Sequence, residues 1–137
     1  MALTHLVDTS VLTRLREPTV RAALEPLTAK GQVARAGISD LEIGYSARTS
    51  IEWDSFQEAL EAFQLVETDA GHVRRARQVQ RLLAARSQRG RKIPDLLVAV
   101  AAEEAGLEVL HYDADFDRIA AVTGQSCVWV VPPGSVA

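Results

Sequence analysis

Short apolar runs alternate with longer segments of helical periodicity along this chain, and this alternation restricts the folds that are open to it. The apolar runs lie at residues 6–7, 33–36, 65–67, 109–111 and 127–131. Helices are predicted between them, at residues 18–29, 39–47, 52–63, 69–86, 95–105 and 115–122. Strands separated by helices pair in parallel, because each helix carries the chain back across a face of the sheet. The sequence therefore predicts an α/β fold with a parallel sheet and helices on both faces.

Two of these helices are predicted in enough detail to test. Ser39 followed by Glu42 has the spacing of a capping box, which starts a helix at Ser39 and continues it through Ala47. Asp69 is expected to cap a longer helix that ends near Arg86. The apolar face of that helix is predicted to consist of Val73, Ala76, Val79 and Leu83.

Length and composition limit the architecture. A chain of 137 residues, 47% of them hydrophobic, is expected to form one domain over residues 1–137. The single cysteine, Cys127, cannot form a disulfide within the chain, so folding does not depend on an oxidising compartment. The sequence contains no apolar run of about eighteen residues and no charged-then-apolar leader. We therefore expect a cytoplasmic protein that does not cross a membrane.

The charges are unevenly distributed along the chain. A net charge of −3 argues against a protein that coats DNA through charge alone. Residues 74–92 nevertheless contain no acidic residue and eight of the fifteen basic ones, namely Arg74, Arg75, Arg77, Arg81, Arg86, Arg89, Arg91 and Lys92. Residues 40–69, in contrast, contain eight acidic residues and one basic residue, Arg48. This separation predicts one surface that binds a polyanion and another that binds a cation.

Carboxylates stand beside apolar sequence in four separate segments, at Asp8, Glu42, Asp95 and Asp113. Asp8 and Asp113 each follow a predicted strand, where sites form in parallel α/β sheets. Buried carboxylates are costly unless they are paired or bind a metal, and carboxylate oxygens suit Mg²⁺ or Mn²⁺. The four segments therefore predict a metal site that could hydrolyse a phosphodiester bond.

Each of these carboxylates also has a purely local explanation. Asp8 can be the N-cap of the helix that follows it, and Asp95, after Pro94, can serve a helix start. Glu42 can be only the capping-box partner of a serine, and Asp113 can be a turn residue. Only the combination of all four points to a shared site.

The aromatic and histidine side chains are expected to be structural. Trp53, Trp129 and Phe116 are predicted to pack in the interior or against it. His111 lies within an apolar run and is expected to be a core or rim histidine, because no second ligand stands at a metal-binding spacing from it.

Five motifs in order give the chain a family resemblance. They are Leu6-Val-Asp-Thr-Ser10, Ile38-Ser-Asp-Leu-Glu42, Lys92-Ile-Pro-Asp-Leu-Leu-Val-Ala99, Leu110-His-Tyr-Asp-Ala-Asp-Phe-Asp-Arg-Ile-Ala120 and Trp129-Val-Val-Pro-Pro-Gly-Ser135. With them the chain resembles the PIN domain ribonucleases, specifically the VapC toxins of VapBC toxin–antitoxin modules, nearly from end to end.

The resemblance implies a fold, an activity and partners. The fold is PIN-like, an α/β/α arrangement with a mostly parallel sheet of about five strands. The activity is a Mg²⁺- or Mn²⁺-dependent endoribonuclease, acting on tRNA or rRNA and so arresting translation and growth. The expected partners are a second copy of the chain, in a homodimer, and a cognate VapB-like antitoxin that blocks the acidic pocket. A PIN-fold module that binds RNA or a partner chain without cutting remains an alternative.

Residue by residue, Asp8, Glu42, Asp95 and Asp113 match the four family acids, and the first, third and fourth are expected to hold the metal. Glu42 is expected to orient or deprotonate the attacking water. Two auxiliary site residues also match, Ser10 and Asp115, whereas Asp117 has no family counterpart. The basic residues before Asp95 are expected to contact the RNA backbone, namely Arg86, Arg89, Arg91 and Lys92.

Overall fold

The computed structural model describes residues 2–88 and 92–137. Two of the expected RNA contacts, Arg89 and Arg91, lie outside the described residues. The elements follow one another as β1 (His5–Val7), α1 (Thr9–Leu12), α2 (Pro18–Ala29), β2 (Val33–Ala36), α3 (Gly37–Tyr45), α4 (Ser50–Leu60), β3 (Gln64–Val66), α5 (Ala70–Ala85), α6 (Ile93–Ala105), β4 (Glu108–His111), α7 (Asp115–Thr123) and β5 (Cys127–Trp129). In the part of the chain described, no helix is long and apolar enough to span a membrane.

The sheet has five strands in the order β3-β2-β1-β4-β5, and every neighbouring pair is parallel. Leu6 of the central strand β1 is in register with Ala34 of β2 on one side and Val109 of β4 on the other. The predicted parallel α/β fold is confirmed. The last strand is shorter than predicted, because β5 ends at Trp129 and the chain then turns at Pro132 and Pro133.

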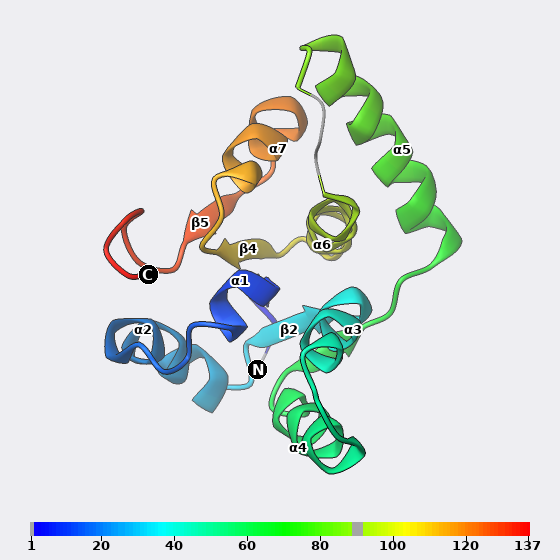
Figure 1. Ribbon diagram of the computed structural model, residues 1–137. Coiled ribbons are helices and arrows are strands. Elements are labelled where there is room, and N and C mark those ends of the chain that lie inside the picture. The colour runs from blue at the N-terminus through cyan, green and yellow to red at the C-terminus, as the bar shows by residue number, and fades with distance from the viewer. Residues whose placement is uncertain (1, 89–91) are drawn as a thin grey trace.

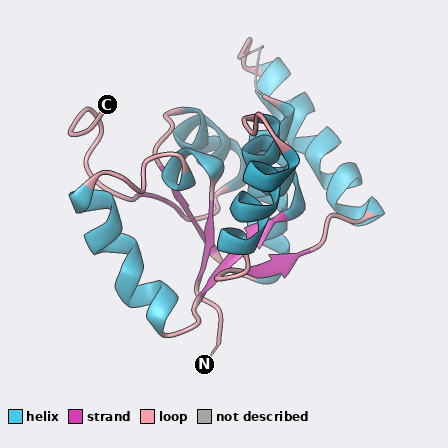
Figure 2. Cartoon of the chain, turned by 60° about the horizontal axis from the view of Figure 1, so that its bottom comes forward, coloured by secondary structure: helices cyan, strands magenta, loops and turns pink. Residues whose placement is uncertain are grey.

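Helices cover both faces of this sheet. Side chains alternate between the faces along a strand, so Leu6 points to one side and Val7 to the other. The core on the Leu6 side is formed with α5, α6 and α7, and the core on the Val7 side with α1, α2 and α4. Figure 1 shows α5, α6 and α7 together on one side of the strands, with α2 on the other. Figure 2 shows the strands fanning out between the two groups of helices.

Two detailed helix predictions are wrong. No capping box forms at Ser39, because α3 follows β2 directly, with Ala36 as its N-cap, and Ser39 lies buried inside the helix. Val73 is 49% exposed, and His72 takes its expected place on the buried face of α5. The N-cap of α5 is confirmed, since Asp69 accepts a hydrogen bond from the backbone N–H of His72.

The strand order brings the predicted site residues to one edge of the sheet. Because β1 and β4 are parallel neighbours, the segments that follow them emerge side by side. The backbone N–H of Asp8, just after β1, donates to the carbonyl of Leu110 in β4 at 2.9 Å. The first turn of α6, which contains Asp95, and the helix α3 approach the same edge.

Candidate active site

A cleft of about 630 Å³ opens at the carboxyl edge of the sheet. All four predicted carboxylates line it, together with Ser10 and Lys92. Its remaining lining consists of Thr9, Thr13, Arg14, Tyr112, Ala114, Trp129, Gly134 and Val136. Residues that are far apart in the sequence therefore share one solvent-accessible space.

Asp8 is both a helix cap and a member of this cleft. Its Oδ2 atom accepts a hydrogen bond from the backbone N–H of Ser10 at 2.9 Å, which caps α1. Its side chain is buried, and this burial raises the pKa of Asp8, with a smaller contribution from the charge of Glu42. Asp8 is thus the N-cap that its local sequence predicts. Capping uses only one of its carboxylate oxygens, so this role does not exclude a second role in the cleft.

Asp95 carries the clearest sign of a ligand site. It lies in the first turn of α6 and is only 5% exposed, yet its Oδ2 atom has no hydrogen-bond partner among the residues that the structure describes. Burial, followed by the charges of Asp8 and Asp113, raises the pKa of Asp95 to about 7. A buried carboxylate oxygen without a partner is costly. Capping does not account for it, because Lys92 is the N-cap residue of α6.

Asp113 is held in its ionised form. Its Oδ1 atom accepts the backbone N–H of Asp115 at 2.9 Å, and its Oδ2 atom lies 3.0 Å from Nζ of Lys92. Burial alone would raise the pKa of Asp113, but the hydrogen bond from Asp115 and the ammonium of Lys92 more than offset it and lower the pKa. The same contact with Asp113 raises the pKa of Lys92.

Glu42 reaches the cleft from α3 and is oriented by Thr9. The Thr9 hydroxyl donates to Oε1 of Glu42 at 2.8 Å and lies 2.9 Å from the hydroxyl of the buried Ser39. Ser10 has a different task, because its Oγ atom accepts the backbone N–H of Tyr112 at 2.8 Å. That hydrogen bond ties the segment of Asp8 to the segment of Asp113.

The donor set of the cleft suits a hard divalent cation. Carboxylate oxygens of Asp95, Asp113 and Asp115 lie within 4.8 Å of one another, and the unpartnered oxygen of Asp95 needs a positive group. Asp8 lies close enough to Asp95 to raise its pKa. Oxygen-only ligands favour Mg²⁺ or Mn²⁺ over softer metals.

A second group of metal-ligand type lies away from this cleft. Asp69, His72 and Glu104 also offer ligand atoms within 4.8 Å of one another. Glu104 stands nine residues along α6 from Asp95, near the other end of the helix. Nε2 of His72 already contacts the carboxylate of Glu104, and neither residue belongs to the cleft lining.

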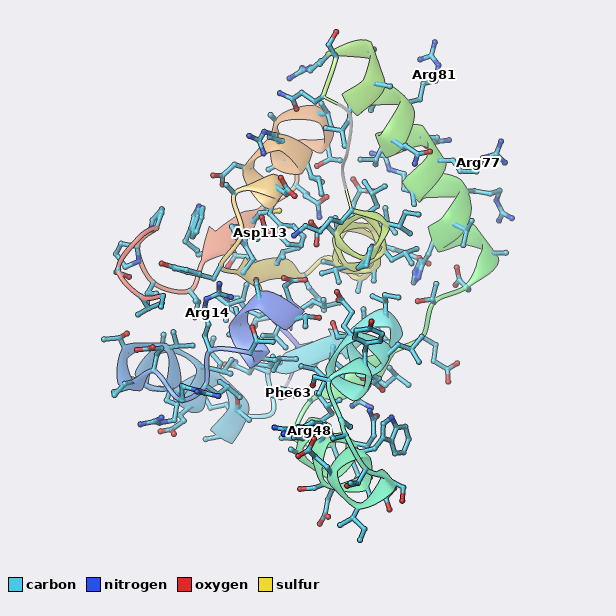
Figure 3. The ribbon with its side chains drawn as sticks, in the orientation of Figure 1. Arg14, Arg48, Phe63, Arg77, Arg81 and Asp113 are labelled. Carbon is cyan, nitrogen blue, oxygen red and sulfur yellow. The ribbon has the colours of Figure 1, made fainter. Side chains whose placement is uncertain are left out.

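The basic side chains divide into two groups. Arg86 is exposed at the end of α5, whereas Lys92 lies within the cleft and contacts Asp113. Figure 3 shows Arg77 and Arg81 pointing outward from α5, on the side away from Asp113. The structure therefore separates Arg77 and Arg81 of α5 from Lys92, which borders the carboxylates.

Sequence reasoning missed eight residues of the cleft lining, among them Thr9, Arg14, Tyr112 and Trp129. Thr9 stands next to Asp8 within the first motif, so its position was a usable signal. Tyr112 likewise stands next to Asp113 within the fourth motif. Arg14 and Trp129 reach the cleft only through the pairing of β4 with β5 and the return of the C-terminal segment. No local pattern predicts that assembly.

Comparison with known proteins identifies the family. The PIN domain family matches residues 5–122. Ribonuclease VapC51 of Mycobacterium tuberculosis is 65% identical over 136 residues, covering 99% of this chain and 99% of the relative. Ribonuclease VapC21 of the same species is 42% identical over 137 residues, covering 98% and 99% of the two chains.

Solved structures agree in fold. VapBC2 from Rickettsia felis, bound to a promoter DNA fragment, matches with a TM-score of 0.77 at 14% identity, covering 94% of this chain and 98% of that one. DNA-bound VapBC from Salmonella typhimurium matches with a TM-score of 0.75 at 18% identity, covering 94% and 99%. With the family match and the relatives above, these findings establish that the chain belongs to the PIN domain family, among its VapC ribonucleases.

Proposed function

We propose that the protein is a Mg²⁺- or Mn²⁺-dependent endoribonuclease that acts as the toxin of a toxin–antitoxin pair. The observation that carries the proposal is the buried, unpartnered oxygen of Asp95 inside a cleft that it shares with Asp8, Glu42 and Asp113. The names of the VapC relatives give the reaction class, because they are ribonucleases. The substrate we propose is tRNA or rRNA, whose cleavage in the cytoplasm would arrest translation.

In this proposal the carboxylates divide the work. Asp8, Asp95 and Asp113 hold the metal, directly or through water, and Asp115 supports the same position. A metal held there would stabilise charge at the phosphate and lower the pKa of a bound water. Glu42 orients the attacking water or accepts its proton, and the hydroxyl of Thr9 fixes Glu42 for that task.

The partners we propose are a VapB-like antitoxin and a second copy of the chain. Support for an antitoxin comes from the structural neighbours, several of which are VapBC complexes. Support for a further protein contact comes from exposed apolar side chains on α3 and α4, where Leu41 is 69% exposed, Tyr45 93% and Ile51 81%. Size-exclusion chromatography with light scattering measures the oligomeric state and tests the homodimer.

The test of the activity is RNA cleavage by the purified, antitoxin-free protein. Wild type is incubated with total cellular RNA and Mg²⁺ or Mn²⁺, beside a reaction with EDTA and one with Asp8→Ala. Asp54→Asn, in the exposed part of α4, serves as the matched acidic control. The proposal predicts discrete products that require metal and Asp8 and that Asp54→Asn still forms.

Other outcomes separate the alternatives. If a folded, metal-loaded wild type binds RNA without cutting it, the protein is a binding module of the PIN fold. If cleavage survives in Asp8→Ala, the activity belongs to a contaminant or to another site. Cleavage of DNA in preference to RNA would contradict the proposed substrate class.

A further inference from the structure

Part of the cleft lining has no task in the proposed metal chemistry. Arg14, Tyr112 and Trp129 border the same space as the carboxylates, beside Gly134 and Val136 of the C-terminal segment. None of these side chains is a carboxylate or a hard metal ligand. Figure 3 labels Arg14 and Asp113, which reach the cleft from the segment after α1 and the segment after β4. This part of the lining is available to bind the substrate.

The indole of Trp129 is held in one orientation without being sequestered. Its Nε1–H donates to the carboxylate of Asp117, 3.1 Å from one oxygen and 3.3 Å from the other. The ring of Tyr112 meets it edge-on, with centroids 5.4 Å apart and an interplanar angle of 87°. The buried ring of His111 lies 5.0 Å from it. Trp129 nevertheless lines the cleft, so its orientation is fixed where a ligand can reach it.

The ring and the hydroxyl of Tyr112, in contrast, are both engaged in contacts within the protein. The guanidinium of Arg14 lies over its ring, 4.7 Å from the centroid. Its hydroxyl donates to the carbonyl of Val136 at 2.8 Å and accepts the backbone N–H of the same residue at 3.2 Å. Arg14 is fixed in turn, because Nη1 donates to the carbonyl of Ser10 at 2.7 Å. Tyr112 is therefore a support, and Trp129 is the aromatic surface left for the cleft.

We propose that Trp129 forms a nucleobase subsite, on which one unpaired base of the RNA stacks beside the scissile phosphate. The inference rests on the proposed ribonuclease function and deepens it. A base offers a neutral π-face that stacks on indole whatever its identity, and single-stranded RNA is commonly bound in this way. Trp129 carries no charge with which to attract a phosphate, so stacking on a base is the attraction that its side chain can add. Asp117 acts as a positioning residue for the indole.

The first test measures binding without cleavage. Trp53 and Trp129 are the two tryptophans of the chain, and Trp53 lies on α4 outside the cleft lining. Trp53→Phe therefore leaves Trp129 as the single tryptophan, which is excited selectively over the two tyrosines, and Asp8→Asn in the same protein prevents turnover. The probes are a ten-nucleotide oligoadenylate and an abasic oligomer of equal length. We expect saturable quenching by the oligoadenylate and at least about tenfold weaker binding of the abasic oligomer.

The matched control is Trp129→Phe in the same Asp8→Asn background, which keeps Trp53. Its fluorescence is expected to stay constant when the oligoadenylate binds. No quenching of Trp129, or equal affinity for the abasic oligomer, would overturn the subsite. Because this readout needs no catalysis, it separates the two proposals. Base-dependent quenching with no cleavage by wild type would retain the subsite and refute the ribonuclease, and cleavage with no quenching would do the reverse.

The second test locates the stacked base during cleavage. Trp129→Ala is expected to raise KM about tenfold, with kcat changed less, and Trp129→Phe is expected to remain near wild type because it keeps an aromatic ring. An abasic nucleotide placed at each position around the cut should impair wild type at one position and cause no further loss in Trp129→Ala. Asp117→Ala should show a milder KM effect that Asp117→Asn, which keeps an acceptor oxygen, rescues. Additive losses from the abasic site and Trp129→Ala would refute the stacking contact.

Discussion

The ammonium nitrogen of Lys92 lies 3.0 Å from Oδ2 of Asp113, inside the cleft that the carboxylates share. The pair joins the residue before α6 to the segment after β4. It helps to keep Asp113 ionised, and it also places a positive charge next to the proposed metal position. The side chain of Lys92 is 60% exposed, so it can move away at little cost when a metal binds.

Lys92→Gln is expected to strengthen Mn²⁺ binding by about two- to fivefold, because it removes a repulsive charge that is partly screened by solvent. The same change should weaken RNA binding, since a cation at the cleft is lost. Isothermal titration with Mn²⁺ measures the first effect. Lys30, the other lysine of the chain, is exposed after α2, and Lys30→Gln is the matched control. Weaker Mn²⁺ binding in Lys92→Gln would show that the ammonium does not compete with the metal.

Asp95→Asn is expected to become more stable than wild type, in the absence of metal, as the pH rises from 4 to 7. The pKa of Asp95 is about 7 in the folded protein against an ordinary value of 3.8, so the folded protein keeps a proton that the unfolded chain releases. The free energy of unfolding of wild type therefore falls as the pH rises across this interval, by about 4 kcal/mol at most. The fall is complete above the pKa of Asp95 in the folded protein. The variant amide does not titrate.

Urea unfolding in EDTA at several pH values measures this difference. His111 acts in the opposite direction, because burial lowers its pKa from 6.5 to about 4 and acid therefore destabilises the fold. Its effect is common to both proteins and cancels in the comparison. Asp54→Asn should follow wild type at every pH. If the difference in stability between Asp95→Asn and wild type does not change with pH, the raised pKa of Asp95 is contradicted.

Thr9→Val should lower kcat while leaving Mn²⁺ affinity nearly unchanged, because it removes the hydroxyl that orients Glu42 and not a metal ligand. It should also cost about 1 to 2 kcal/mol of stability, since the buried hydroxyl of Ser39 loses its neighbour. Thr13→Val is the matched control in the same cleft, where the hydroxyl is exposed. Equal kcat values for the two variants would remove Thr9 from the mechanism.

Arg86→Gln should weaken RNA binding and reduce the slope of log K against log salt by about 0.7 to 0.9, as expected for one lost phosphate contact. Mn²⁺ affinity should not change, because Arg86 lies outside the cleft lining. Arg48→Gln, between α3 and α4 in the acidic part of the chain, is the comparison. Filter binding of tRNA over a salt series gives both slopes. An unchanged slope in Arg86→Gln would exclude the contact.

Much of the fold follows from local signals. The helix at Pro18–Ala29 and the strand at Val33–Ala36 agree with prediction, because a proline opens the helix and a short apolar run forms the strand. Ser39 shows where local rules fail. Its capping-box spacing is real, but the chain enters α3 straight from β2, and the serine side chain turns toward Thr9 of another segment.

The cleft shows the same division between local and tertiary information. The carboxylates could be predicted, because each stands at an unusual position beside buried sequence. Asp95 could be separated from a helix-start residue only by its unpartnered oxygen, which is a tertiary property. Trp129 was expected to be a packing residue, and its place in the cleft depends on the pairing of β5 with β4 and on the contact with Asp117.

The most direct measurement is anomalous diffraction from crystals of the protein grown with Mn²⁺. The account predicts a peak inside the cleft beside Asp95 and Asp113, with carboxylate oxygens about 2.2 Å from the ion where they bind it directly and one water farther away where they do not. In Asp95→Asn this peak should weaken or disappear. A Mn²⁺ peak confined to Asp69, His72 and Glu104, with none beside Asp95, would contradict the proposed metal centre and the mechanism built on it.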